Sequence, residues 1–116
     1  MNILLMHTHD SGRFLQPYGY AVETPNLQTF AEQGTLFRQA FSVAPTCSPS
    51  RAGMLTGQYP HNCGMFGLAH RGFRLSDYKK HIANYMKDFG FETILCGIQH
   101  EAPDAEMIGY TRILDK

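Results

Sequence analysis

The sequence of 116 residues contains no tryptophan, few cysteines and no excess of either charge. Three cysteines are an odd number, and without close-paired spacing they argue against a disulfide framework or a zinc knuckle. Ten basic residues balance ten acidic ones, so the charge pattern of a nucleic-acid-binding or membrane-surface protein is missing. We therefore expect neither nucleic acid nor a membrane as a partner.

Long hydrophobic runs are missing as well. The apolar run after Met1 spans residues 3–6, too short for a signal peptide or a membrane span. If Met1 is the true start, we expect a cytoplasmic protein. A chain of this length can bury roughly two-thirds of its unfolded surface, which is enough for one small domain.

Strand and helix signals alternate along the chain. Apolar runs predict strands at residues 2–6, 36–43 and 91–96, and a further element at 107–114. Helix start and stop signals bound three segments: Thr24 to Gly34, Ser48 to Leu55, and Ser76 to Gly90. This order predicts an α/β fold with a mostly parallel sheet flanked by helices. Residues 58–74 are expected to form a long glycine-rich loop.

Two apolar features are expected to lie in the core. The third predicted helix carries an apolar stripe at helical spacing, which is typical of a buried face. The stripe consists of Ile82, Tyr85, Met86 and Phe89. Cys96, at the end of the third predicted strand, is expected to be buried as well.

Reactive side chains follow the predicted strands. His9 and Asp10 come after the first strand, Cys47 after the second and His100 after the third. Ligands of open α/β sheets bind at the carboxyl ends of the strands. We therefore expect three separate segments to converge on one crevice.

The residues from Cys47 to Arg51 combine three chemical features. Ser48 is a good N-cap and Pro49 suits the first position of a helix. Arg51 lies one turn beyond Cys47, so its guanidinium is expected beside residue 47. The free amides of a helix start favour a bound anion. The pattern predicts a nucleophile, a cation and an anion-binding helix end.

This run, Cys-Ser-Pro-Ser-Arg followed by Leu-Thr-Gly at 55–57, resembles the signature of the sulfatase family. Further stretches resemble the family in the expected order, and residues 62–68 are closest to its sulfamidase-like branch. These stretches lie at residues 2–5, 24–27, 34–37 and 40–41. The resemblance implies the N-terminal part of an alkaline-phosphatase-like fold, since sulfatases are several times longer. Residues 1–116 are thus expected to be an incomplete fragment of a single catalytic domain with exposed apolar surface.

The resemblance also implies an activity and its partners. In sulfatases the signature cysteine, here Cys47, is oxidised by a separate maturation enzyme to formylglycine, whose hydrate attacks a sulfate ester or a sulfamate. Arg51 would neutralise charge on the sulfate, and His100 would protonate the leaving group. The substrate would be a sulfated small molecule or glycan.

Sulfatases also hold a divalent cation, commonly calcium, and the resemblance assigns Asp10, His9 and Cys47 to that site. Two residues depart from the family pattern. His9 stands where the usual ligand is an aspartate, and imidazole is a poor ligand for a hard cation. Ile98 stands where the family's Gly-Lys-x-His motif has its sulfate-binding lysine.

Three alternatives remain open from the sequence. The departures allow an inactive, truncated remnant that at most binds anions near Arg51. His7 and His9 form a His-x-His pattern that resembles zinc amidohydrolases and metal-dependent phosphoesterases. The third alternative is hydrolysis of a phosphate or phosphonate ester, a reaction closer to sulfate ester hydrolysis than the zinc alternative is.

Overall fold

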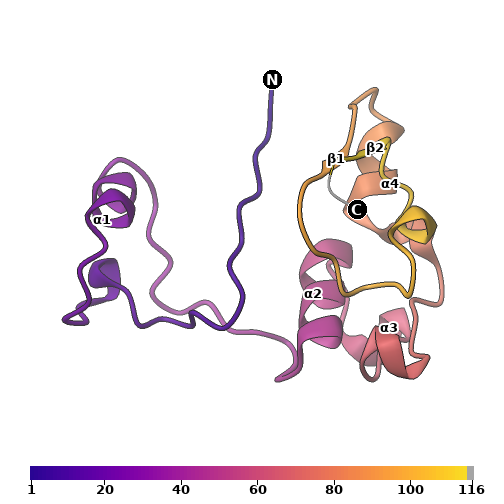
Figure 1. The fold of residues 1–116 in the computed structure, drawn as a ribbon, viewed down its shortest axis with the longest axis horizontal. Coiled ribbons are helices and arrows are strands. Elements are labelled where there is room, and N and C mark those ends of the chain that lie inside the picture. Colours follow the sequence, from indigo (N-terminus) through magenta and orange to yellow (C-terminus); the bar gives the residue numbers. More distant parts are fainter. Residues whose placement is uncertain (115–116) are drawn as a thin grey trace. The chain divides into compact units, whose positions relative to one another are not determined.

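The structure is a computed structural model that describes residues 1–114, so Asp115 and Lys116 lie outside the described part. The chain forms two compact units, Met1–Ala40 and Phe41–Lys116. Figure 1 shows the path of the chain through each of them.

The first unit contains the 3-10 helix η1 (Gln16–Tyr18) and the helix α1 (Pro25–Glu32). α1 begins at Pro25, as predicted, because a proline at the first position loses no helical hydrogen bond. The side chain of Thr24 does not cap the helix. Its Oγ1 accepts from the Gln16 N–H, and its own N–H donates to Gln16 Oε1, both at 3.1 Å. This exchange joins η1 to the start of α1.

The second unit holds the remaining helices. They are α2 (Cys47–Thr56), α3 (Pro60–Cys63), η2 (Ala69–Arg71), η3 (Tyr78–Lys80), α4 (Ile82–Lys87) and η4 (Ala105–Ile108). α2 packs against α3 (Figure 1), and α4 packs against η3. The predicted loop at residues 58–74 therefore contains two short helical turns.

A parallel strand pair confirms the α/β class. β1 (Ile94–Leu95) and β2 (Arg112–Ile113) are hydrogen-bonded in parallel, with Ile94 opposite Arg112 and Leu95 opposite Ile113. Both strands lie inside the ranges predicted at 91–96 and 107–114 but are much shorter. Parallel strands require a crossover connection, and η4 lies in this one.

The strands predicted at residues 2–6 and 36–43 are wrong. Neither range contains a strand, and Ile3 and Leu4 are 63% and 83% exposed. A buried strand must place its backbone N–H and C=O groups on neighbouring strands. Within residues 1–114 the β1–β2 pair is the whole sheet, so these apolar runs have no strand to pair with.

The third predicted helix is broken into η3 and α4. Asp77 and His81 cap the two pieces, accepting from the N–H groups of Lys79 and Ala83, so the predicted cap at Ser76 is wrong.

The apolar stripe predicted to lie in the core is wrong too. Its members are largely exposed, at 44% for Ile82, 56% for Tyr85 and 64% for Phe89. α4 buries Ala83 instead, and the exposed stripe fits the expectation of apolar surface.

Two small apolar clusters form the core of the second unit. The first contains Ala52, Cys63, Met65 and Leu75, and the second contains Ala83, Ala102 and Ile108. Tyr78 packs against both clusters and donates its hydroxyl to the Glu101 carbonyl at 3.0 Å. The start of η3 therefore ties α2 to the segment after β1.

Cys96 is exposed, which corrects the expectation that it is buried.

Gly64 and Gly72 provide a matched test of packing around α3. Both have a left-handed φ, +85° and +91°, but a Cβ at Gly64 would lie 2.2 Å from Ser76 Oγ, whereas one at Gly72 would meet nothing within 4 Å. We expect Gly72→Ala to cost about 1 kcal/mol of unfolding free energy and Gly64→Ala about 2–3 kcal/mol. Urea denaturation of both variants measures the difference. Equal losses would contradict the close approach.

His81 makes stability depend on pH. Its side chain is fully buried, and burial lowers the pKa of His81 below its usual 6.5 against the opposing effect of Glu101. The unfolded chain therefore takes up this proton at a higher pH than the folded chain does, so stability falls as the pH drops below about 6.5. His81→Asn keeps an acceptor for Ala83 and does not titrate. We expect denaturation midpoints measured between pH 7.5 and 5 to fall less in His81→Asn than in the parent or in the exposed control His70→Asn.

Candidate functional site

Cys47 is the first residue of α2. The extended residue Thr46 precedes it and accepts the first helical hydrogen bond, from the Ser50 N–H at 3.0 Å. Ser48 and Pro49 therefore lie within the first turn, so Ser48 is not the N-cap as predicted. N–H groups of a first turn have no acceptor inside the helix and carry partial positive charge. The side chain of residue 47 thus lies at the anion-attracting end of α2.

Ser48 anchors this end of the helix. Its side chain is buried, and Oγ accepts from the Ala69 N–H at the start of η2 at 3.1 Å. Two residues further on, Ser50 Oγ lies 2.7 Å from Ser42 Oγ on the segment that leads into α2. The first turn is thus held on both sides.

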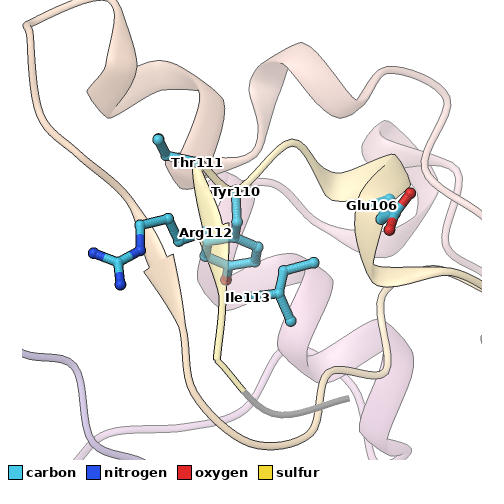
Figure 2. Close-up of a pocket in the computed structure, with 5 residues that line it drawn as sticks. All are labelled: Glu106, Tyr110, Thr111, Arg112 and Ile113. Atoms are coloured by element: carbon cyan, nitrogen blue, oxygen red, sulfur yellow. The ribbon is translucent and has the colours of Figure 1, made fainter.

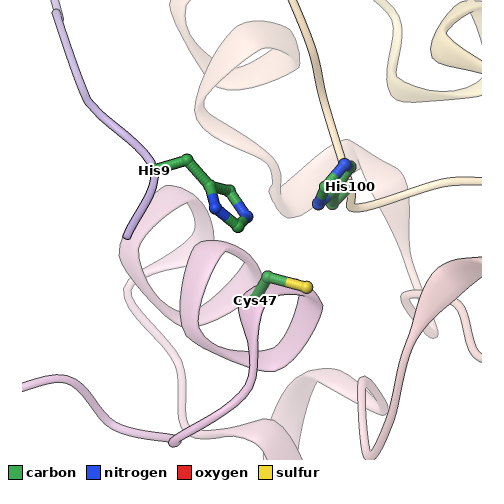
Figure 3. A group of neighbouring side chains, drawn as sticks. All are labelled: His9, Cys47 and His100. Carbon is green, nitrogen blue, oxygen red and sulfur yellow. The ribbon is translucent and has the colours of Figure 1, made fainter. Parts of the chain in front are cut away.

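His100 approaches Cys47 from the segment after β1. A ring nitrogen of His100 lies within 4.8 Å of Cys47 Sγ, and both side chains are partly buried (Figure 3). Two of the three predicted catalytic residues therefore meet within the second unit, although they come from segments far apart in the sequence. Of the two residues only His100 follows a strand, because the strand predicted before Cys47 is not formed.

Arg51 reaches the same segment as His100. Its Nε donates to Glu101 Oε1 at 2.5 Å, and its Nη2 donates to the Ile98 carbonyl at 2.9 Å. The Arg51 side chain is 15% exposed, and the Glu101 side chain is fully buried. That the guanidinium lies beside residue 47 stays a prediction, and these hydrogen bonds join it to Ile98 and Glu101. The predicted cation is thus an ion-pair partner.

Glu101 is the residue that sequence reasoning missed. Its Oε2 accepts from the His100 N–H at 3.1 Å, and its own N–H donates to Gln99 Oε1 at 2.9 Å. Its place directly after His100 was a signal, because an acid next to a candidate catalytic histidine is well placed to orient it. Nothing in the local sequence pattern indicated that this carboxylate is buried or that it pairs with Arg51.

Two tyrosine hydroxyls near this carboxylate remain protonated at neutral pH. Burial raises the pKa of Tyr78 above its usual 10.0. Burial and then the Glu101 charge raise the pKa of Tyr110 as well. Tyr78 therefore stays a hydrogen-bond donor to the Glu101 carbonyl.

The predicted metal ligands His9 and Asp10 belong to the first unit. His9 Nδ1 lies 2.9 Å from Asp10 Oδ2, and Asp10 has a left-handed φ of 59°. The Asp10 side chain is 89% exposed. Calcium takes six to eight oxygen ligands, whereas this turn offers one carboxylate and the hydroxyls of Thr8 and Ser11. The first unit's own donor set does not fit calcium, and the set of His9, Asp10 and Cys47 stays a prediction.

A hollow of about 250 Å³ lies along β2, apart from the predicted site residues. Glu106, Tyr110, Thr111, Arg112 and Ile113 line it (Figure 2). None of these residues was predicted to be catalytic.

None of the helices among residues 1–114 is long and apolar enough to cross a membrane.

Comparison with known proteins decides the family. The model of the Sulfatase family matches residues 2–115. The chain belongs to the sulfatase family. This membership confirms the resemblance carried by Cys47 and its neighbours, and with it the incomplete α/β fold of the alkaline-phosphatase type. No solved structure gave a significant match.

Several curated sulfatases are similar to this chain. An "Ulvan-active sulfatase" of Formosa agariphila is 40% identical over 83 residues, which are 72% of this chain and 16% of the relative. The human "N-sulphoglucosamine sulphohydrolase" is 35% identical over 106 residues, 89% of this chain and 21% of the relative. An "Arylsulfatase" of Klebsiella aerogenes is 32% identical, with coverage of 85% and 23%. The chain therefore spans about a fifth of the length of these relatives.

The buried ion pair should be worth far more than an exposed one. Arg51→Ala leaves the Glu101 carboxylate buried without its cation, and we expect it to lower the unfolding free energy by about 3–5 kcal/mol. Arg112→Ala breaks the exposed pair with Glu92, in which N and O lie 3.5 Å apart, and should cost less than about 1 kcal/mol. Urea denaturation at pH 7 compares the two variants. Similar losses would show that Arg51 and Glu101 are not paired in a dry environment.

Proposed function

We propose that this chain is the N-terminal part of a sulfuric ester hydrolase whose nucleophile is formylglycine made from Cys47. The observation that carries the proposal is the meeting of Cys47, at the start of α2, with His100 in a chain of the sulfatase family. A thiol at this place lies beside a proton-transferring group and at the positive end of a helix. That is the arrangement needed to attack an anionic ester.

The residues of the chain have distinct roles in this proposal. The aldehyde hydrate made from Cys47 supplies the attacking hydroxyl and a second hydroxyl that later expels sulfate. His100 is within reach to donate a proton to the departing alcohol or amine. The first-turn amides of α2 favour the sulfate oxygens. Arg51 contributes by holding the segment that carries His100.

A divalent cation is part of the proposal, with Asp10, His9 and Cys47 as its ligands. Because the first unit alone lacks enough oxygen donors for calcium, we infer that further ligands come from outside these residues. Such a cation would neutralise charge on the sulfate oxygens. A separate maturation enzyme would convert Cys47.

A sulfated glycan is the substrate class that the relatives favour. One relative is named for activity on ulvan and another for hydrolysis of N-sulphoglucosamine. Both a sulfate ester and a sulfamate fit the same roles of residues 47 and 100. The zinc alternative rests on the His-x-His pattern of His7 and His9 and leaves Cys47 and the residues after it unexplained, so we rank it below the sulfatase proposal. The other alternative is an inactive remnant that binds anions, and activity measurements distinguish it from the proposed hydrolase.

Mass spectrometry of protein matured in its native host tests the nucleophile. We expect the peptide across Cys47 to lose about 18 Da relative to unmodified cysteine, as thiol-to-aldehyde conversion requires. Cys47→Ala should abolish release of sulfate from an aryl sulfate, and the exposed control Cys96→Ala should retain it. An unmodified thiol with no turnover would instead support the anion-binding remnant.

A further inference from the structure

We infer that Glu101 is the positioning residue of this site and that it sets His100 and Arg51 around residue 47. The inference rests on the proposed function, because it concerns how the proposed proton donor is held. It starts from the carboxylate's two oxygens, which bind different groups. Oε1 accepts from Arg51 Nε and Oε2 accepts from the backbone N–H of His100. One fully buried side chain thus links α2 to the histidine's own backbone.

The segment that carries His100 is held largely by hydrogen bonds, among them that of the Tyr78 hydroxyl to the Glu101 carbonyl. Gly97 has a left-handed φ of +92°, and the Ile98 side chain is 75% exposed, so it contributes no core packing. Arg51 Nη2 holds the Ile98 carbonyl, while Oε1 of Gln99 accepts from the N–H of Glu101. The ion pair thus supplies two of the hydrogen bonds that hold this segment, at the Ile98 carbonyl and at the His100 N–H.

The ion pair also changes the charge that an anion meets. Glu101 compensates the charge of Arg51, so the guanidinium does not act as an isolated cation. A neutral residue at 101 leaves that charge uncompensated and removes a carboxylate that repels sulfate. The same change weakens the hold on His100. Loss of Glu101 should therefore have opposite effects on binding and on turnover, which a merely structural role does not predict.

Glu101→Gln separates the two functions of the carboxylate. Glutamine has nearly the same shape but a single acceptor oxygen, so it cannot serve both Arg51 and the His100 N–H. We expect the His100 amide to exchange with solvent at least about tenfold faster in NMR measurements on the 116-residue chain. The amide of the buried core residue Ile108 should keep its rate.

Aryl sulfate kinetics on matured protein give the second readout. We expect Glu101→Gln to lower kcat about tenfold while KM stays unchanged or falls. The matched control is Glu92→Gln, which breaks the exposed pair with Arg112 and should alter neither the His100 exchange rate nor kcat. If Glu101→Gln does not fold, Glu101→Asp takes its place. It keeps both oxygens but withdraws them by one methylene, and should accelerate His100 exchange.

Three results would overturn the inference. They are unchanged exchange at His100, an equal increase at His100 and Ile108, and a loss of kcat/KM that lies entirely in KM. Failure of the proposed function is distinguishable from these. A matured parent chain that releases no sulfate contradicts the proposed activity, whereas the exchange rates still decide whether Glu101 holds His100.

Discussion

The buried ion pair between Arg51 and Glu101 is the interaction on which the rest of the site depends. Taking both charges out of water is costly, and such a pair adds little net stability compared with apolar residues of the same volume. Its value lies in specificity, because a buried carboxylate must find its cation and its remaining donors. Here those partners are one residue on α2 and the backbone beside His100. The pair therefore fixes one segment relative to the other.

Around this pair the sulfatase signature acquires a physical meaning. Position 47 needs a helix start, because unsatisfied amides there attract an anion, and the buried Ser48 Oγ holds that start against η2. Arg51 follows one turn later, where it can reach across to the segment after β1. The signature thus contains both the reactive residue and the arginine that holds the His100 segment near it.

Local features could be predicted from the sequence, and long-range ones could not. Pro25 and Pro49 marked two helices because the constraints of proline act within one turn. The run at 36–43 looked like a strand, but a strand exists only where another chain segment accepts its hydrogen bonds. Likewise Glu101 resembled any loop carboxylate until folding placed it against Arg51. The helical period of Ile82 and Phe89 was real, but periodicity does not specify what covers the apolar face.

An NMR titration of the chain with inorganic sulfate tests most directly whether α2 and the His100 segment form one anion site. The proposal predicts saturable shifts that are largest at the amides of Cys47, Ser48 and His100. Shifts that do not saturate, or that centre on the exposed loop at His70 and Arg71, would contradict it.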